Sequence, residues 1–146
     1  MKHDLTKATF IIPVRIESDD RLRNVITSVC YLLSNFDTTI ILREVDDRSI
    51  FVEEALPQII EFCGDIKGLI HQFVFSESQT FHRQSILNDM IMESETEIVV
   101  NYDCDILLPI ESYLSAYNTI LDKESDVVYP YGDGDYQYRV MADDEL

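Results

Sequence analysis

Short runs of apolar and β-branched residues alternate with longer amphipathic patterns along this chain, and that alternation constrains its fold more than any other feature. We expect strands where the runs are continuous, at residues 8–14, 38–42, 69–75, 97–102 and 126–129. We expect helices where apolar residues recur every three or four positions, at residues 22–36, 49–63, 81–95 and 110–121, with Pro57 breaking or kinking the second. Strands separated by helices predict an α/β fold with a mostly parallel sheet covered on both faces.

Polar clusters follow three of the predicted strands. The first is Pro13–Arg15, the second is Glu44–Asp47 and the third is Asp103–Asp105. Because ligands bind at the carboxyl ends of strands in parallel sheets, we expect the three clusters to converge on one edge. This convergence predicts a binding site better than any one cluster does.

The acidic pair Asp103 and Asp105 interrupts an otherwise apolar stretch, between the strand at 97–102 and Ile106–Pro109. Burying two ionised carboxylates is costly unless a positive charge meets them, so we expect a divalent cation there. Carboxylate oxygens suit Mn²⁺ or Mg²⁺, which also bind substrate phosphates. The alternative is a solvated turn whose charges cap the following helix.

Two arginines are candidates for phosphate binding. Arg15 follows the first strand, and Arg83 lies two residues after Phe81 at an expected helix start. With only four glycines the chain has no Gly-rich phosphate loop, so metal and arginine must hold any diphosphate. Alternatively, both arginines form surface ion pairs and Phe81 belongs to the core. Glu44 and Asp46 could accept hydrogen bonds from a nucleobase or ribose, or cap the next helix.

Composition excludes several classes of function. At 146 residues the chain fits one domain, and its net charge is −17. Residues 89–146 hold 15 acidic against 2 basic residues, which disfavours nucleic acid and anionic membranes as partners. No stretch approaches transmembrane length. Three widely spaced cysteines predict reduced thiols in a cytoplasmic protein rather than a disulfide framework or zinc cluster.

Three segments together resemble the donor-binding half of a GT-A type glycosyltransferase. Phe10–Arg15 resembles that family's first strand with its Pro-x-Arg, and Phe81–Asn88 resembles its Phe-x-Arg-x-x-x-Leu-Asn helix start. Asn101–Pro109 is similar to its Asp-x-Asp metal motif with the trailing proline. The order matches over residues 8–131, and the likeness is closest to galactosyltransferase-like proteins, including the N-terminal region of the β-1,4-galactosyltransferases and family 2-like enzymes.

The resemblance implies a Rossmann-like fold, a nucleotide-sugar donor such as a UDP-hexose, and hexosyl transfer to an unknown acceptor with inversion. It assigns the uridine and diphosphate to four residues, which are Pro13, Arg15, Phe81 and Arg83. It also implies that Glu44 or Asp46 lies near the base or ribose, and that Asp103 contacts the ribose or the donor sugar. Asp105, with Asp103 beside it, would ligate Mn²⁺.

The family's acceptor-binding part, catalytic base and further histidine ligand follow the region matched here. We therefore expect residues 1–146 to form one donor-binding domain, either a fragment or a short form, and identify no catalytic base; Asp133 and Asp135 are only positioned near the expected edge. The main alternative is a non-catalytic acidic module that binds another protein. A sugar nucleotidyltransferase is disfavoured because residues 14–18 contain no glycine.

Overall fold

The computed structural model describes residues 1–130, which belong to two compact units, the first Met1–Leu108 and the second beginning at Pro109. The first unit is built on a four-stranded, entirely parallel sheet in the order β3-β2-β1-β4. Its strands are β1 (His3–Val14), β2 (Phe36–Asp46), β3 (Leu69–Phe75) and β4 (Ile98–Asn101). The predicted α/β class with a parallel sheet is confirmed.

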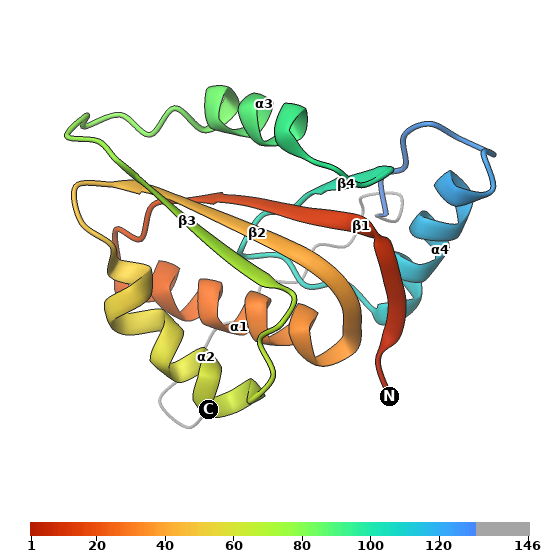
Figure 1. Cartoon of the computed structure of the whole chain (residues 1–146), viewed down its shortest axis with the longest axis horizontal. Helices are drawn as coiled ribbons and strands as arrows, with labels where there is room; N and C mark the ends of the chain where they lie inside the picture. Colours follow the sequence, from red (N-terminus) through yellow and green to blue (C-terminus); the bar gives the residue numbers. More distant parts are fainter. Residues whose placement is uncertain (131–146) are drawn as a thin grey trace. The chain divides into compact units, whose positions relative to one another are not determined.

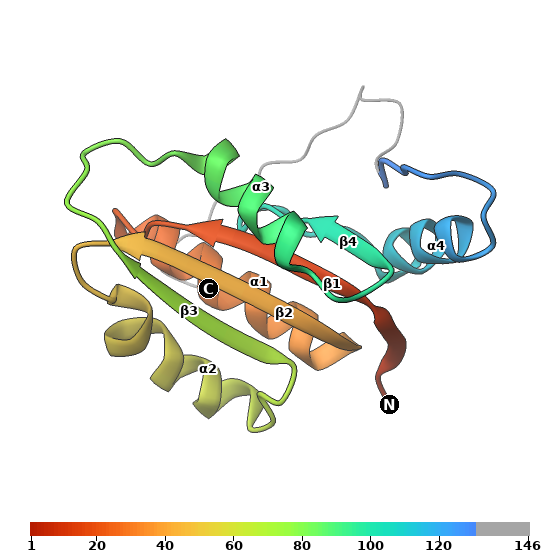
Figure 2. The same cartoon turned by 45° about the horizontal axis from the view of Figure 1, so that its top comes forward.

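Helices cover both faces of this sheet, as expected (Figure 1). One face carries α1 (Asp19–Asn35), the π-helical turn η1 (Phe51–Ala55) and α2 (Leu56–Cys63). The opposite face carries α3 (Arg83–Glu93), which crosses the sheet above β1 and β2 (Figure 2). Because side chains alternate along a strand, Ile11 of β1 packs against Leu87 and Met90 of α3, while its neighbours point to the α1 side.

The register of the sheet brings the carboxyl ends of the strands to one edge. Val14, the last residue of β1, lies beside Glu44 of β2, while Ile11 of β1 lies beside Asn101, the last residue of β4. Asp46 at the end of β2 lies beside Phe75 at the end of β3. The segments that follow all four strands therefore leave the sheet on the same side.

The helix starts follow from local chemistry. Ser18 caps α1, its side chain accepting a hydrogen bond from the Arg21 backbone N–H, and Asp19 and Asp20 fill the first turn as expected. The helix expected over residues 49–63 is interrupted next to Pro57, as predicted. The chain before it winds as η1 and α2 begins at Leu56, so Pro57 lies in the first turn, where its missing N–H costs nothing.

The second unit contains α4 (Ile110–Leu121), with the bounds that its apolar spacing predicts. The prediction of a fifth strand at Asp126–Tyr129 is wrong, because those residues have no strand structure. Among the residues the structure describes, no helix is both long and apolar enough to cross a bilayer.

Candidate functional site

The Asp103–Asp105 turn faces outward rather than into the core. Asp103 and Asp105 are exposed. Tyr102, which precedes them, is 5% exposed, and Cys104, which lies between them, is 6% exposed. The expectation of two buried carboxylates is therefore wrong: the chain alternates here, with apolar side chains inward and acids outward. Burial raises the pKa of the Cys104 thiol, which disfavours a nucleophilic role for it.

Contacts with β1 and α1 hold this turn in place. The Tyr102 ring packs edge-on against Phe10, with ring centroids 5.5 Å apart. On the α1 side, Ser28 Oγ donates a hydrogen bond to the Cys104 carbonyl, and Tyr31 Oη donates one of 2.7 Å to the carbonyl of Leu108. A rigid helix thus fixes the backbone on which both carboxylates are presented.

Arg83 and Asp103, two predicted site residues from distant parts of the chain, form an ion pair. The same Nη2 of Arg83 also donates to Asn101 Oδ1 at 3.2 Å. Arg83 is the first residue of α3 and Asn101 the last of β4, so the pair links a helix start to a strand end. Both charged side chains remain well exposed, and a ligand can reach them.

Arg15 is the buried cation of the site. Its Nε donates to the Val45 carbonyl at 2.8 Å, and its Nη1 donates to the Ser78 carbonyl at 2.9 Å. The guanidinium also lies over the Phe81 ring, 5.6 Å from its centroid. Arg15 is only 8% exposed. Its Nη2 atom is buried and has no hydrogen-bond partner among residues 1–130. A buried donor without a partner is costly, so this atom is well suited to a ligand acceptor.

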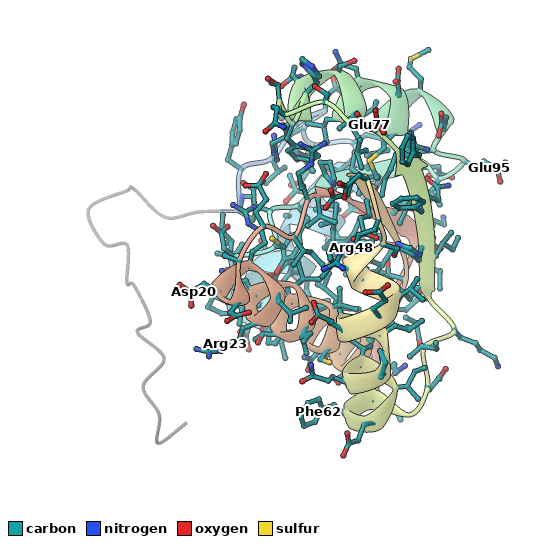
Figure 3. The ribbon with its side chains drawn as sticks, turned by 90° about the vertical axis from the view of Figure 1, so that its left-hand side faces the viewer. Asp20, Arg23, Arg48, Phe62, Glu77 and Glu95 are labelled. Atoms are coloured by element: carbon teal, nitrogen blue, oxygen red, sulfur yellow. The ribbon has the colours of Figure 1, made fainter. Side chains whose placement is uncertain are left out.

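A cavity of about 230 Å³ opens beside Arg15, among the ends of β1, β2 and β3. Four carboxylates line it, those of Glu17, Asp46, Asp47 and Glu77. Glu77 projects from the segment after β3 (Figure 3). The cavity therefore offers hydrogen-bond acceptors around one buried cationic donor, a combination that suits a polar ring with both N–H and carbonyl groups.

Glu44 does not line this cavity. Its carboxylate is fully buried and accepts hydrogen bonds from Ser49 Oγ at 2.6 Å and from the backbone N–H of Phe51 at 3.0 Å, with His71 Nε2 also 3.2 Å away. It therefore caps the start of η1, which is the second of the roles considered for it. Pro13 is buried within β1.

The carboxylates of the site suit a metal ion only in part. Within residues 1–130, no three His, Cys, Asp or Glu side chains gather as a metal site. Two exposed carboxylates at Asp103 and Asp105 still fit Mg²⁺ or Mn²⁺, since these ions keep waters and share substrate phosphates. A metal ion held by these two carboxylates would need its remaining ligands from water or from a bound ligand.

Two parts of this edge are absent from the predicted site. The segment after β3 contributes Glu77 and the Ser78 carbonyl, and it could have been expected because β3 ends at the same edge as the other strands. Asn101 had a weaker signal, as a polar residue closing an apolar strand. Asp133 and Asp135 lie outside the described residues.

No family model matches the chain, and no curated protein matches it. Among solved structures it is similar to residues 1–349 of S. aureus TarS, which has a GT-A-like glycosyltransferase fold, with a TM-score of 0.53 and 19% identity. The likeness covers 86% of this chain and 34% of that one, so this chain spans about a third of the solved structure. At this identity the likeness concerns the fold.

Proposed function

We propose that this chain binds a nucleotide sugar, as the donor-binding half of a metal-dependent glycosyltransferase. The supporting observation is a continuous series of contacts across the strand ends. Arg15 lies over Phe81, the Phe81 carbonyl accepts from the Arg83 backbone N–H, and Arg83 pairs with Asp103. Residues up to 88 positions apart thus lie along one edge of the sheet. In the proposed complex the base lies near Arg15, the diphosphate near Arg83 and the sugar near Asp103.

In this proposal the base enters the cavity beside Arg15. The unpartnered Nη2 donates to a base carbonyl, and Asp46 accepts from a ring N–H or a ribose hydroxyl. Uracil carries both kinds of group, so UDP is the proposed nucleotide and a UDP-hexose the proposed donor. Pro13 contributes by restricting the backbone one residue before the end of β1. The buried Glu44 contributes by holding the loop between β2 and η1.

The diphosphate lies between Arg83 and the acidic turn. Arg83 is exposed enough to donate to phosphate oxygens while keeping contact with Asp103, which is placed to meet ribose or the donor sugar. Asp105 would hold Mn²⁺ or Mg²⁺, which, when bound, supplies Lewis-acid stabilisation of the leaving diphosphate. Attack by an acceptor hydroxyl at the anomeric carbon, with inversion, belongs to the same proposal.

Thermal unfolding with UDP and Mn²⁺ tests it. We expect UDP to raise the midpoint only when Mn²⁺ is present, since ligand at about 100 times its Kd stabilises by about 2.7 kcal/mol. Asp105→Asn should abolish the metal-dependent part of the shift. Asp89→Asn, which removes an exposed carboxylate of α3, should leave it unchanged. Absence of a shift in the wild type, or an equal shift in Asp105→Asn, would refute the proposal.

One observation favours a second function, a non-catalytic module that binds a basic protein. The 15-to-2 excess of acid in residues 89–146 is larger than a two-carboxylate metal site requires. Calorimetric titration separates the two functions. If the chain is a non-catalytic module, it should have no metal-dependent affinity for UDP, whereas the donor-binding proposal requires such an affinity.

A further inference from the structure

The outer edge of β3 has no strand partner among residues 1–130. In the sheet order β3-β2-β1-β4, β3 pairs with β2 on one side only, and it borders the sheet in Figure 2. Its residues, Leu69–Phe75, include no Lys, Arg, Asp, Glu or Pro, and they pair with β2 without a bulge. Charges, proline, bulges or shortness protect most natural edge strands, and β4 at the other edge has only four residues. The edge of β3 lacks these protections and is open to another strand.

The backbone groups on this open edge belong to every second residue of β3. Just before the strand, the Gly68 carbonyl accepts from the Ile40 N–H at 2.7 Å. Just after it, the Ser76 N–H donates to the Asp46 carbonyl at 2.9 Å. The even-numbered residues thus bond to β2, and because backbone groups alternate along a strand, the odd-numbered ones point outward. These outward residues are Leu69, His71, Phe73 and Phe75.

Apolar side chains line the same edge on both faces of the sheet. Four of them are 41% to 62% exposed, and these are Ile70, Phe73, Val74 and Phe75. His71 stacks on Phe51 of η1, with ring centroids 4.6 Å apart, so the odd-numbered side chains lie on the α1 side of the sheet and the even-numbered ones on the α3 side. A strand added at this edge would cover apolar groups of both faces at once.

The side chains of β3 are nearly symmetric about its central residue, Gln72. Ile70 and Val74, two positions away on either side, are both apolar. Leu69 and Phe75, three positions away, are apolar too. A two-fold axis at Gln72 would therefore place apolar side chains opposite one another along two antiparallel copies of the strand. A contact between identical copies requires such self-complementarity, whereas a contact with a different protein does not.

Charge extends this symmetry beyond the strand. Lys67 lies five positions before Gln72, Glu77 lies five positions after it, and both are exposed. Antiparallel pairing about Gln72 would bring Lys67 of each copy toward Glu77 of the other. This local attraction, made twice in one dimer, opposes the general repulsion between two chains that each carry a charge of −17. A second copy of the chain is thus the partner that the sequence around β3 matches.

We propose that two copies of this chain pair antiparallel along β3, about a two-fold axis at Gln72, and join their sheets into one. In this register His71 of one copy lies opposite Phe73 of the other, and the two exchange backbone hydrogen bonds. A register shifted by one residue would set outward groups against groups already bonded to β2. The Leu69 N–H stays bonded to the Ile66 carbonyl, so the central pairs hold the dimer. None of these residues lines the cavity of the proposed nucleotide site, so the contact is independent of it.

Sedimentation velocity over about 1 µM to 1 mM protein measures the association, since interfaces of this small size bind weakly. We expect the mass to double as the concentration rises. Val74→Lys would place a lysine opposite Ile70 of the partner copy and should raise the dimer Kd at least about ten-fold. Phe62→Lys is the matched control, because it makes the same change in charge at a residue that is 72% exposed and points away from the fold (Figure 3). Its Kd should equal that of the wild type.

A charge exchange tests the same contact without altering β3 itself. Lys67→Glu should raise the dimer Kd, because glutamates of the two copies then face each other at both ends of the paired strands. Adding Glu77→Lys should restore the wild-type Kd, and the double variant keeps the wild-type net charge. Circular dichroism confirms that each variant is folded. If Val74→Lys does not fold, the charge exchange carries the comparison, since both of its sites are exposed and lie outside the strand.

Cross-linking tests the register. Gln72→Cys would put one sulfur on each side of the axis, on Cα atoms about 4.5 Å apart, which a disulfide can span. We expect oxidised glutathione to join two chains of this variant, above the background that the three native cysteines give in the wild type. Val74→Cys faces Ile70 in the same register and should not exceed that background.

Three results would overturn the proposal. One is a wild type that stays monomeric up to about 1 mM. Another is a dimer whose Kd is unchanged by both Val74→Lys and Lys67→Glu, since the contact would then lie elsewhere. The third is cross-linking of Val74→Cys as strong as that of Gln72→Cys, since the axis would then not lie at Gln72.

Discussion

The pairing of Arg83 with Asp103 has a consequence for the order in which ligands bind. Before a ligand arrives, the guanidinium already neutralises one of the two carboxylates proposed for the metal. A metal ion alone must therefore compete with Arg83 for Asp103, whereas a diphosphate offers Arg83 another anion. Metal and nucleotide should each strengthen the binding of the other.

Replacing Arg83 by glutamine tests this competition. We expect Arg83→Gln to raise the Mn²⁺ affinity of the nucleotide-free protein by about two- to five-fold, the equivalent of an exposed ion pair. The same change should weaken binding of UDP with Mn²⁺. Calorimetric titration measures both quantities, with Arg23→Gln, an exposed arginine of α1, as the control (Figure 3). A lower Mn²⁺ affinity in Arg83→Gln would contradict the competition.

Glu44 and Asp46 lie two residues apart on β2 and should respond differently to substitution. Glu44→Ala leaves the buried Phe51 N–H without its acceptor, so we expect the free energy of unfolding to fall by about 2–4 kcal/mol. Asp46→Asn keeps the shape of a partly exposed side chain and should cost less than about 1 kcal/mol. Urea denaturation measures both, and equal losses would show that the cap on η1 is unimportant.

The directions of several site side chains could be predicted from the sequence. Ile40, Leu42 and Glu44 alternate along β2, and all three are fully buried, so the inward direction of Glu44 could have been predicted from its spacing. The same reasoning applied to Asp103 and Asp105 gives their outward direction. The partnership of Arg83 with Asp103 could not be predicted in this way, since it depends on how α3 is placed over the sheet.

Among the secondary structure elements, β3 and α4 have the predicted bounds, while β1 starts five residues earlier than expected, at His3. Four of the five residues at 3–7 are polar, and the strand includes them because Phe36 and Asp37 of β2 lie beside His3 and Asp4. Pairing between strands, rather than local pattern, sets that boundary. The segment at 126–129, with its apolar residues at 127–129, does not form a strand. A local apolar pattern without a neighbouring strand to pair with is insufficient.

The start of β3 depends on Gly68. A Cβ on this residue would overlap the backbone carbonyl oxygen of Thr38, at the point where the Ile40 N–H donates to the Gly68 carbonyl at 2.7 Å. We expect Gly68→Ala to lower the free energy of unfolding by about 1–3 kcal/mol, because two strands must separate locally. Lys67→Ala, at the exposed preceding residue, should change it by less than about 0.5 kcal/mol in the same urea titration. A Gly68→Ala chain as stable as the wild type would contradict this account.

For the whole molecule, charge is the dominant feature. A net charge of −17 on 146 residues makes the folded state repel itself, because 28 acidic residues face only 11 basic ones. We expect the free energy of unfolding to rise between about 0.05 M and 0.5 M NaCl, since salt screens exposed charges. Urea titrations at both salt concentrations measure the change. A fall would mean that ion pairs such as Arg43 with Glu93 outweigh the general repulsion.

The order of the strands also determines how this sheet has to assemble. Its central strand β1 pairs with β2 and with β4, and Ala8 lies beside Ile98, 90 residues further along the chain. Parallel neighbours cannot form through a tight hairpin, so every pairing closes a long loop and the contact order is high. Folding should accordingly be slow for a chain of this size. During synthesis on the ribosome, the apolar edge of β1 must remain unpaired until β4 has emerged, which makes the nascent chain a substrate for chaperones.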